Sequence, residues 1–454
     1  MESEIIELIE GKNYTRLRSM LSEMNPADIA IILEEAPKRE LPVIFRILPK
    51  ESAAEVFAYM ESDMQQLLIE AFSDAELRQV MDELFMDDTV DIIDEMPASV
   101  AKRILKQTDA ATRKMINKLL AYPDDSAGSI MTTEYVDLKR DMTVDEAFDR
   151  IRAIGVDTET IYTCYVIDKS RNLLGIVTVK DLLLSPKSEL IENIMEENII
   201  FANTLDDKEE VANQFDKYDL MALPVVDTEN RLVGIVTVDD AIDVIQEEAT
   251  EDIEKMAAII SSDDKSYFKT GIFSTFKSRI PWLMFLMLSA TFTGAIISSF
   301  ESKLTVFPAL IAFIPMLMGT AGNCGSQSSV TVIRSISLGD IEFRDIFRVL
   351  WKEIRVAVLC GGALAIVNFV KMYLVDFLLL HNFDTGWQVI EISTVCLTVF
   401  FTAIVAKLVG SALPVIAKKI GFDPAVMASP FITTIVDAIT LAIYFGIAVF
   451  LLEI

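Results

Sequence analysis

The sequence predicts a multidomain protein: an all-α superhelical N-terminal domain, an α/β tandem repeat, and an all-α polytopic membrane domain with five transmembrane helices. Three observations lead to this prediction. Residues 1–268 carry 27 basic and 58 acidic side chains, whereas residues 269–454 carry 13 and 11. Within the acidic part, one segment repeats at a spacing of about 60 residues. The second part contains five long apolar segments. An acidic, water-soluble region is therefore joined to a membrane region.

Residues 1–125 are predicted to form the superhelical domain. Apolar residues recur at helical spacing in segments such as DIAIILEEAP and DAELRQVMDELF. Prolines separate the segments, at positions 26, 37, 42, 49 and 97, because proline is tolerated at the start of a helix but not in its interior. Short helices joined in this way are typical of a stacked helical array. The block shows no catalytic motif.

The repeat has one copy at 129–190 and a second at 191–245. Each copy reads as strand, helix, two strands joined by a polar turn, and helix. The copies share the motifs GIVTVKD at 175–181 and GIVTVDD at 234–240. These paired motifs resemble a tandem of CBS domains. The resemblance implies an α/β regulatory module, which in many families binds adenosine nucleotides.

A nucleotide such as ATP is therefore a candidate ligand of the tandem. The matching residues are Thr178, Asp181, Thr237 and Asp240, since the acid of a Thr-x-x-Asp motif could orient a ribose. The same pairs also read as capping boxes at the start of a helix. Both interpretations stay open at this point.

A connecting helix is predicted at 240–268, before the membrane domain at 269–454. Residues 240–260 contain neither proline nor glycine, which favours one continuous helix. Acidic residues recur on it every three or four positions, namely Asp240, Asp243, Glu247, Glu251 and Glu254, so they share one face. The five apolar segments that follow are each long enough to cross a bilayer core of about 30 Å. They lie at 280–300, 306–333, 356–380, 392–416 and 425–452.

The basic residues predict the orientation of these spans. The N-terminal sequence MESEIIELIEGKN is acidic and does not read as a cleavable signal peptide, so the N-terminal and repeat domains are expected in the cytoplasm. Basic residues such as Arg279, Arg334, Lys352 and Lys418 then flank the inner ends of the spans, and Lys303 lies outside. Five spans would place the C-terminus outside a multi-pass protein of the cell membrane.

Composition argues against several classes of function. A region with a net charge of −31 repels phosphate backbones, so no nucleic-acid partner is expected. The four cysteines show no CxxC spacing, which argues against a zinc ribbon or a disulfide framework. The single histidine, His381, cannot supply a site with two histidine ligands. No enzyme activity is predicted.

Two features of the apolar segments indicate an ion path. Asp437 lies in the middle of the fifth segment, where an ionised carboxylate costs at least about 2.5 kcal/mol and should face a hydrated or protein-lined cavity. Residues 315–329 are rich in glycine, hydroxyl and amide groups, which allow close helix packing and expose carbonyls to an ion. The alternative for Asp437 is a structural carboxylate paired with Lys407 or with polar groups of the second segment. Oxygen donors of this kind suit a hard cation such as Mg²⁺.

The whole arrangement resembles the MgtE family of magnesium channels. The most specific stretches are PMLMGTAGNCGSQSS at 315–329 and DPAVMASPFITTIVDAITLAIY at 423–444. The resemblance implies a homodimer in the lipid bilayer, with a pore between the subunits. It assigns hydrated Mg²⁺ to Asp437 and places Asn323 beside that site. Family members often have Gly or Asn where this chain has Ser429, so the share of that position in the pore stays open.

The same resemblance implies that regulatory Mg²⁺ ions bridge acidic surfaces and hold the channel closed. The matching positions are Glu55, Asp87, Asp91, Asp207, Glu209, Asp219, Asp240, Asp243, Glu248, Glu251, Asp252 and, at the inner mouth, Asp423. Taken singly, each of these acids also fits an ordinary solvated surface. Their concentration in one half of the chain favours cation binding.

The sequence therefore predicts a magnesium-selective channel or transporter for uptake, closed by cytoplasmic Mg²⁺. One alternative is a CBS-regulated transporter of another divalent cation, Mn²⁺ or Co²⁺. Another is a membrane-anchored metabolite sensor without transport. An intramembrane protease would need zinc ligands that one histidine cannot supply, and a CBS-bearing chloride channel would need many more spans.

Overall fold

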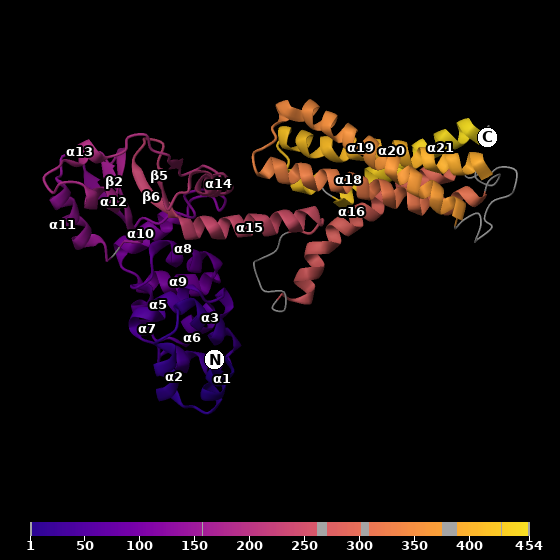
Figure 1. Ribbon diagram of the computed structural model, residues 1–454. Coiled ribbons are helices and arrows are strands. Elements are labelled where there is room, and N and C mark those ends of the chain that lie inside the picture. Colours follow the sequence, from indigo (N-terminus) through magenta and orange to yellow (C-terminus); the bar gives the residue numbers. More distant parts are fainter. Residues whose placement is uncertain are drawn as a thin grey trace. The chain divides into compact units, whose positions relative to one another are not determined.

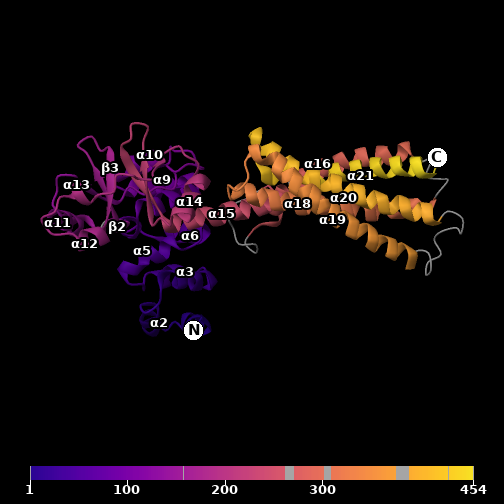
Figure 2. The ribbon, with the colours of Figure 1, turned by 45° about the horizontal axis from the view of Figure 1, so that its top comes forward.

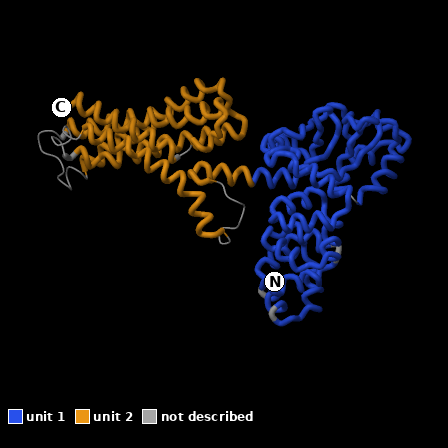
Figure 3. Tube along the Cα trace, turned by 180° about the vertical axis from the view of Figure 1, so that it is seen from behind, with its two compact units in different colours: residues 1–246 blue, residues 247–454 orange. Residues whose placement is uncertain are grey.

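The computed structural model describes residues 2–156, 158–260, 270–300, 308–374, 388–427 and 429–452. The chain divides into two compact units, Met1–Gln246 and Glu247–Ile454 (Figure 3). The first unit contains the acidic helices and the repeat. The second contains the long apolar helices.

The first unit begins with short helices connected by turns (Figure 1). Their bounds are α1 Glu2–Glu10, α2 Tyr14–Leu21, α3 Pro26–Glu35, α4 Leu41–Phe45, α5 Lys50–Ala58, α6 Ser62–Ala71, α7 Asp74–Met81, α8 Met86–Glu95, α9 Ala98–Gln107 and α10 Ala110–Leu119. The prolines lie at helix boundaries: Pro26 is the first residue of α3, and Pro97 is the N-cap of α9. The predicted all-α N-terminal domain is confirmed.

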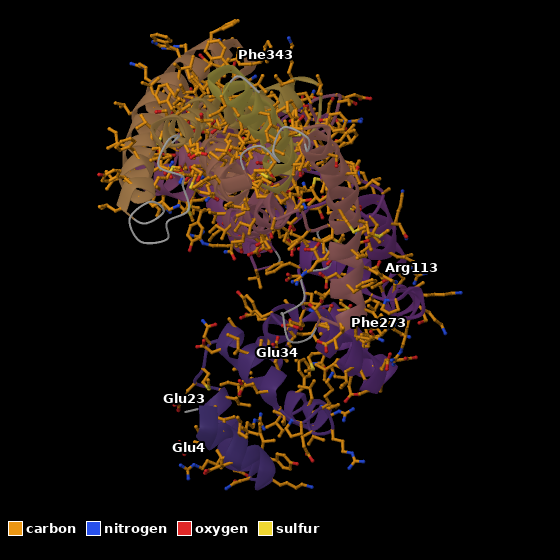
Figure 4. All side chains as sticks on the ribbon, turned by 90° about the vertical axis from the view of Figure 1, so that its right-hand side faces the viewer. Glu4, Glu23, Glu34, Arg113, Phe273 and Phe343 are labelled. Atoms are coloured by element: carbon orange, nitrogen blue, oxygen red, sulfur yellow. The ribbon has the colours of Figure 1, made fainter. Side chains whose placement is uncertain are left out.

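Aromatic rings hold the middle of this helical block together. Phe45, Phe57 and Phe72 are buried and lie with ring centroids 5.3 to 6.3 Å apart. Acidic side chains, including Glu4 and Glu23, project from the outer surface (Figure 4). The block thus has an apolar interior and an acidic exterior.

The two repeats have the same topology. The first contains β1 Tyr135–Lys139, α11 Val144–Ile154, β2 Thr160–Ile167, β3 Leu173–Thr178 and α12 Val179–Leu184. The second contains α13 Ile191–Ile194, β4 Ala202–Asn203, α14 Lys208–Tyr218, β5 Ala222–Val226 and β6 Leu232–Thr237. In each three-stranded sheet the first pair of strands is parallel and the second antiparallel. Tyr135, Tyr165, Leu173 and Leu232 share a small core to which both repeats contribute.

The connecting helix is α15, Val238–Met256. It begins in the first unit and ends in the second. It is shorter than the predicted 240–268 helix, because Ala258 has a left-handed φ of 57° and the Ile259 amide donates to the Glu254 carbonyl, which closes the helix end. Residues 261–269 lie outside the described part of the chain.

The second unit consists mainly of long helices that run side by side (Figures 1 and 2). They are α16 Ile272–Ser299, η1 Pro308–Phe313, α18 Ile314–Ser337, η2 Phe343–Asp345, α19 Ile346–Lys371, α20 Gln388–Lys419, η4 Pro424–Met427 and α21 Ser429–Leu452. Phe273, near the start of α16, is 82% exposed (Figure 4).

Four stretches of the described chain are long and apolar enough to cross a membrane: Ile272–Ser299, Phe343–Leu374, Val389–Lys419 and Pro424–Leu452. The predicted second span is not among them. Its helix, α18, has 24 residues, but its glycine, hydroxyl and amide groups lower its hydropathy. The prediction of five spans is therefore supported for four, and the ends of the second and third predicted segments lie partly outside the described residues.

Candidate ion path and acidic regulatory surfaces

Asp437 lies on the third turn of α21 and is half-buried. Among the residues that the structure describes, no hydrogen-bond or ion-pair partner contacts its carboxylate. Lys407 of α20, the predicted alternative partner, instead donates a hydrogen bond of 3.2 Å to Ser328 Oγ. The alternative of an Asp437–Lys407 pair is therefore wrong.

The glycines of α18 permit close packing against the neighbouring helices. A Cβ atom at Gly322 would lie 2.9 Å from Thr433 of α21, and one at Gly325 would lie 2.8 Å from Ile432. A Cβ atom at Gly410 of α20 would overlap the backbone of Gly325. The predicted role of small residues in helix packing is thus visible at these contacts.

Asn323 and Gln327 of α18 are not buried in these packing contacts. They lie one turn apart on α18, and both are exposed in the single chain. An exposed amide is costly against lipid, so this face suits a hydrated path or a second subunit. Asp437, Asn323 and Gln327 are thus candidate ligands in the described part of the membrane unit.

A dense acidic cluster lies in the first unit. It joins Asp87, Asp88 and Asp91 of α8 to Glu134 and Glu159 of the first repeat and to Asp239 and Asp240 of α15. Glu134 accepts a hydrogen bond of 3.0 Å from the Met86 amide and so caps α8. One buried oxygen of Glu159 has no hydrogen-bond partner within the described chain.

Burial and mutual repulsion raise the pKa values of these acids. Burial and the Asp240 carboxylate raise the pKa of Asp88 to about 6, and burial and Asp87 raise the pKa of Glu159 to about 9. The pKa values of Asp87 and Asp240 are also raised, mainly by burial. The pKa of Asp91 is raised by desolvation and by Asp87, although part of its side chain stays exposed. The cluster therefore favours protons or another cation.

Other predicted ligands lie apart from this cluster or at its edge. Asp243 is exposed on α15, and burial and Asp239 raise its pKa. Glu55 is exposed on α5, and Asp219 is exposed at the C-terminal end of α14. Asp207 caps α14 by accepting hydrogen bonds from the backbone amides of Glu209 and Glu210. In the described residues, no three Asp, Glu, Cys or His side chains are arranged to hold a metal ion.

The nucleotide candidates form the expected capping boxes. Thr178 Oγ1 donates to Asp181 Oδ2 at 2.5 Å, and Thr237 Oγ1 donates to Asp240 Oδ2 at 2.5 Å. Both acids are thus engaged at the start of a helix, and Asp240 also belongs to the acidic cluster.

The end of α15 contacts the region before α21. Lys255 Nζ lies 2.7 Å from Asp423 Oδ2 and 2.7 Å from Glu251 Oε1. Ser337 Oγ of α18 donates to Asp252 Oδ2 at 3.3 Å. Met256 packs against Ile333 and Ala425. These contacts lie within the second unit.

The predicted acids of this region are therefore partly paired with a basic group. Glu251 and Asp423 bind Lys255, and the partly buried Glu248 lies on the same helix. Burial alone would lower the pKa of Lys255. The Asp423 and Glu251 carboxylates raise it by more, so the pKa is raised overall and the ammonium stays charged. Burial and the Asp423 carboxylate raise the pKa of Asp252.

Several functional candidates did not emerge from the sequence. Asp88, Glu134, Glu159 and Asp239 are single acids in an acid-rich region, and no motif distinguishes them. Lys255 could have been singled out from the sequence, because it is the only basic residue within the acidic helix α15.

The chain matches the models of known families along most of its length. Residues 24–125 match the MgtE intracellular N domain, 127–187 and 191–247 match the CBS domain, and 314–447 match the MgtE divalent cation transporter. The cytosolic domain of the Mg²⁺ channel MgtE in complex with ATP is similar in structure. Its TM-score is 0.51 at 35% identity, over 54% of this chain and all of that one.

Full-length relatives are similar in sequence. The magnesium transporter MgtE of Thermus thermophilus is 36% identical over 98% of this chain and 97% of its own length. The magnesium transporter MgtE of Bacillus subtilis is 33% identical over 98% of this chain and 96% of its own length. Together with the helical domain, the repeat pair and the apolar helices, these matches show that the chain belongs to the MgtE family of magnesium transporters.

Proposed function

We propose that the protein is a homodimeric Mg²⁺ channel for uptake, in which hydrated ions pass Asp437 and cytoplasmic Mg²⁺ closes the path. The observation that carries the proposal is the carboxylate of Asp437, which lies in an otherwise uncharged helix. A half-buried carboxylate without a basic partner costs free energy in a membrane unless a cation or water offsets that cost. Magnesium keeps much of its hydration shell, so one carboxylate and a few amides suffice.

Flux through reconstituted full-length protein tests this path. We expect Asp437→Ala to abolish Mg²⁺ flux into liposomes and Asp437→Glu to retain weak flux. Asp340→Asn, which changes an exposed acid between α18 and α19, is the matched control and should conduct normally. Wild-type flux in Asp437→Ala would refute the path.

The same assay separates the proposal from its alternatives. Flux of Mn²⁺ or Co²⁺ in preference to Mg²⁺ would favour a transporter of another divalent cation. A protein that binds ligands but conducts no ion would be a sensor. Chemical cross-linking of the purified protein in detergent tests the homodimer.

For regulation, we infer that Mg²⁺ binds the acidic cluster of the first unit. Two features support this: burial and the neighbouring carboxylates raise the pKa values of Asp88 and Glu159, and α15 links the cluster to residues beside the start of α21. A bound cation would replace protons and lower the repulsion between α8 and α15. Asp207, Glu209 and Asp219, at the two ends of α14, are then further candidates for weaker sites.

ATP binding to the CBS pair belongs to the same proposal. Its support is the ATP complex of the similar cytosolic domain. Calorimetric titration of the full-length protein with ATP, and with GTP as a control, tests it. Binding heat on addition of ATP but not of GTP would support the site. Thr178→Ala should reduce this heat if the first repeat holds the ribose.

A further inference from the structure

Three buried polar side chains from three helices meet inside the membrane unit. They are Ser328 of α18, Glu353 of α19 and Lys407 of α20, with exposed fractions of 2%, 9% and 4%. Ser328 Oγ donates to Glu353 Oε2 at 2.6 Å and accepts from Lys407 Nζ at 3.2 Å. The serine hydroxyl therefore bridges a buried acid and a buried base.

This network holds two opposite charges where water is scarce. Buried charges are costly unless they are paired and hydrogen-bonded, and hydrogen bonds to charged groups are the stronger ones. The donor and acceptor roles fit one arrangement only: ammonium to hydroxyl, and hydroxyl to carboxylate. The network therefore favours a single rotation of α18 relative to α19 and α20.

The neighbouring residues of α18 differ in burial. Ser329, the next residue along α18, is fully buried and donates at 3.2 Å to the Met427 carbonyl, just before α21. Gln327, the residue before Ser328, is exposed, and so is Asn323, one turn before Gln327. The buried serines thus anchor one side of α18 while the amides occupy its other side.

We propose that Glu353 and Lys407, joined through Ser328, are positioning residues for ion conduction. They fix the rotation of α18 and so hold Asn323 and Gln327 toward the ion path. This inference rests on the proposed function, which places that path beside Asp437. It assigns a role to a charged pair that does not itself touch the ion.

Flux through full-length protein in liposomes tests the inference, with Mg²⁺ and Mn²⁺ measured separately. Ser328→Ala removes the bridge and keeps both charges. We expect maximal Mg²⁺ flux to fall about ten-fold, as for loss of a hydrogen bond to a charged group, and the Mg²⁺ to Mn²⁺ flux ratio to change. Ser411→Ala is the matched control, because Ser411 is equally buried on α20 but, among the described residues, its hydroxyl donates to its own helix, at the Leu408 carbonyl.

Two further comparisons separate loss of the hydroxyl from a change of shape, and loss of the charge pair from a change of either charge. Ser328→Thr and Ser328→Val have the same shape and differ by the hydroxyl, so only the threonine variant should retain the wild-type ion ratio. Exchange of the charges, Glu353→Lys with Lys407→Glu, should restore flux relative to either single change. An unchanged ion ratio in Ser328→Ala, or equal effects of the threonine and valine variants, would overturn the positioning role.

Asp437→Ala in the same assay separates this inference from the proposed function. Normal flux in Asp437→Ala would refute the ion path itself. Loss of flux in Asp437→Ala together with wild-type behaviour of Ser328→Ala would refute the positioning role alone.

Discussion

At the residue scale, the carboxylates between α8 and α15 connect proton binding to stability. Asp88 and Glu159 have pKa values of about 6 and about 9, above the values of about 3.9 and 4.3 in unfolded chains. At pH values between the unfolded and the folded pKa values, the folded state binds more protons than the unfolded state. The free energy of unfolding therefore falls as pH rises from about 4 through the folded pKa values.

We therefore predict that the effect of Mg²⁺ on the first unit depends on pH. Without Mg²⁺, hydrogen exchange of the α8 amides in the full-length protein should become faster as the pH is raised from 6 to 9, beyond the intrinsic increase of free peptides. Mg²⁺ should slow exchange most at high pH, where protons no longer compete. Glu159→Gln should flatten the dependence, and Glu229→Gln, an exposed acid in the second repeat, should not. A pH-independent Mg²⁺ effect would contradict the prediction.

Single residues differ in how far the sequence predicts their role. Asp437 stood out because an acid in a long apolar segment has few ordinary explanations. Glu159 did not, because an acid in a chain with 69 acidic residues is unremarkable until the fold brings it beside Asp87 and Asp239. Burial of Lys407 with Ser328 and Glu353 depends on helix packing, which periodicity alone does not specify.

At the scale of elements, α15 ends against the region that precedes α21. Its Lys255 neutralises Asp423 and Glu251, so we expect the lysine to hold α15 in place when Mg²⁺ is scarce. Lys255→Gln should raise flux at low cytoplasmic Mg²⁺ by roughly two- to five-fold, the range for partly exposed ion pairs. Closure at high Mg²⁺ should persist, because the ion can replace the ammonium. Lys114→Gln on α10 is the control, and unchanged flux in Lys255→Gln would remove this role.

The polar composition of α18 also makes it the element that decides the topology. If α18 crosses the bilayer with the four apolar helices, five spans place the two termini on opposite sides. A reporter fused after Ile454 should then be active outside the cytoplasm, while one fused before Met1 is active inside. Cytoplasmic activity of both reporters would show an even number of spans.

At the scale of the whole molecule, the order of the domains was predictable, because helical periodicity, the internal repeat and the apolar segments are each local in sequence. The length of α15 was not, since a left-handed Ala258 ends it without a glycine or proline signal. Under the proposed regulation, we expect Mg²⁺ to act by offsetting the charge of several acidic sites. A ligand shifts the population only by its preference for one state, and moving from mostly open to mostly closed takes about 5.5 kcal/mol, so several weak sites must act together.

Removing several of these sites at once should therefore abolish sensing without abolishing conduction. In wild-type protein, millimolar Mg²⁺ should slow hydrogen exchange of α8 and α15 and close the channel, because bound ions offset the repulsion between the two helices. The triple variant Asp87→Asn, Asp243→Asn, Glu251→Gln should lose that protection and conduct at high Mg²⁺. The matched triple variant Glu23→Gln, Asp82→Asn, Glu83→Gln removes the same charge from exposed surface and should close normally. Equal closure of both variants would mean that the acidic surface serves solubility alone, and that another signal gates the channel.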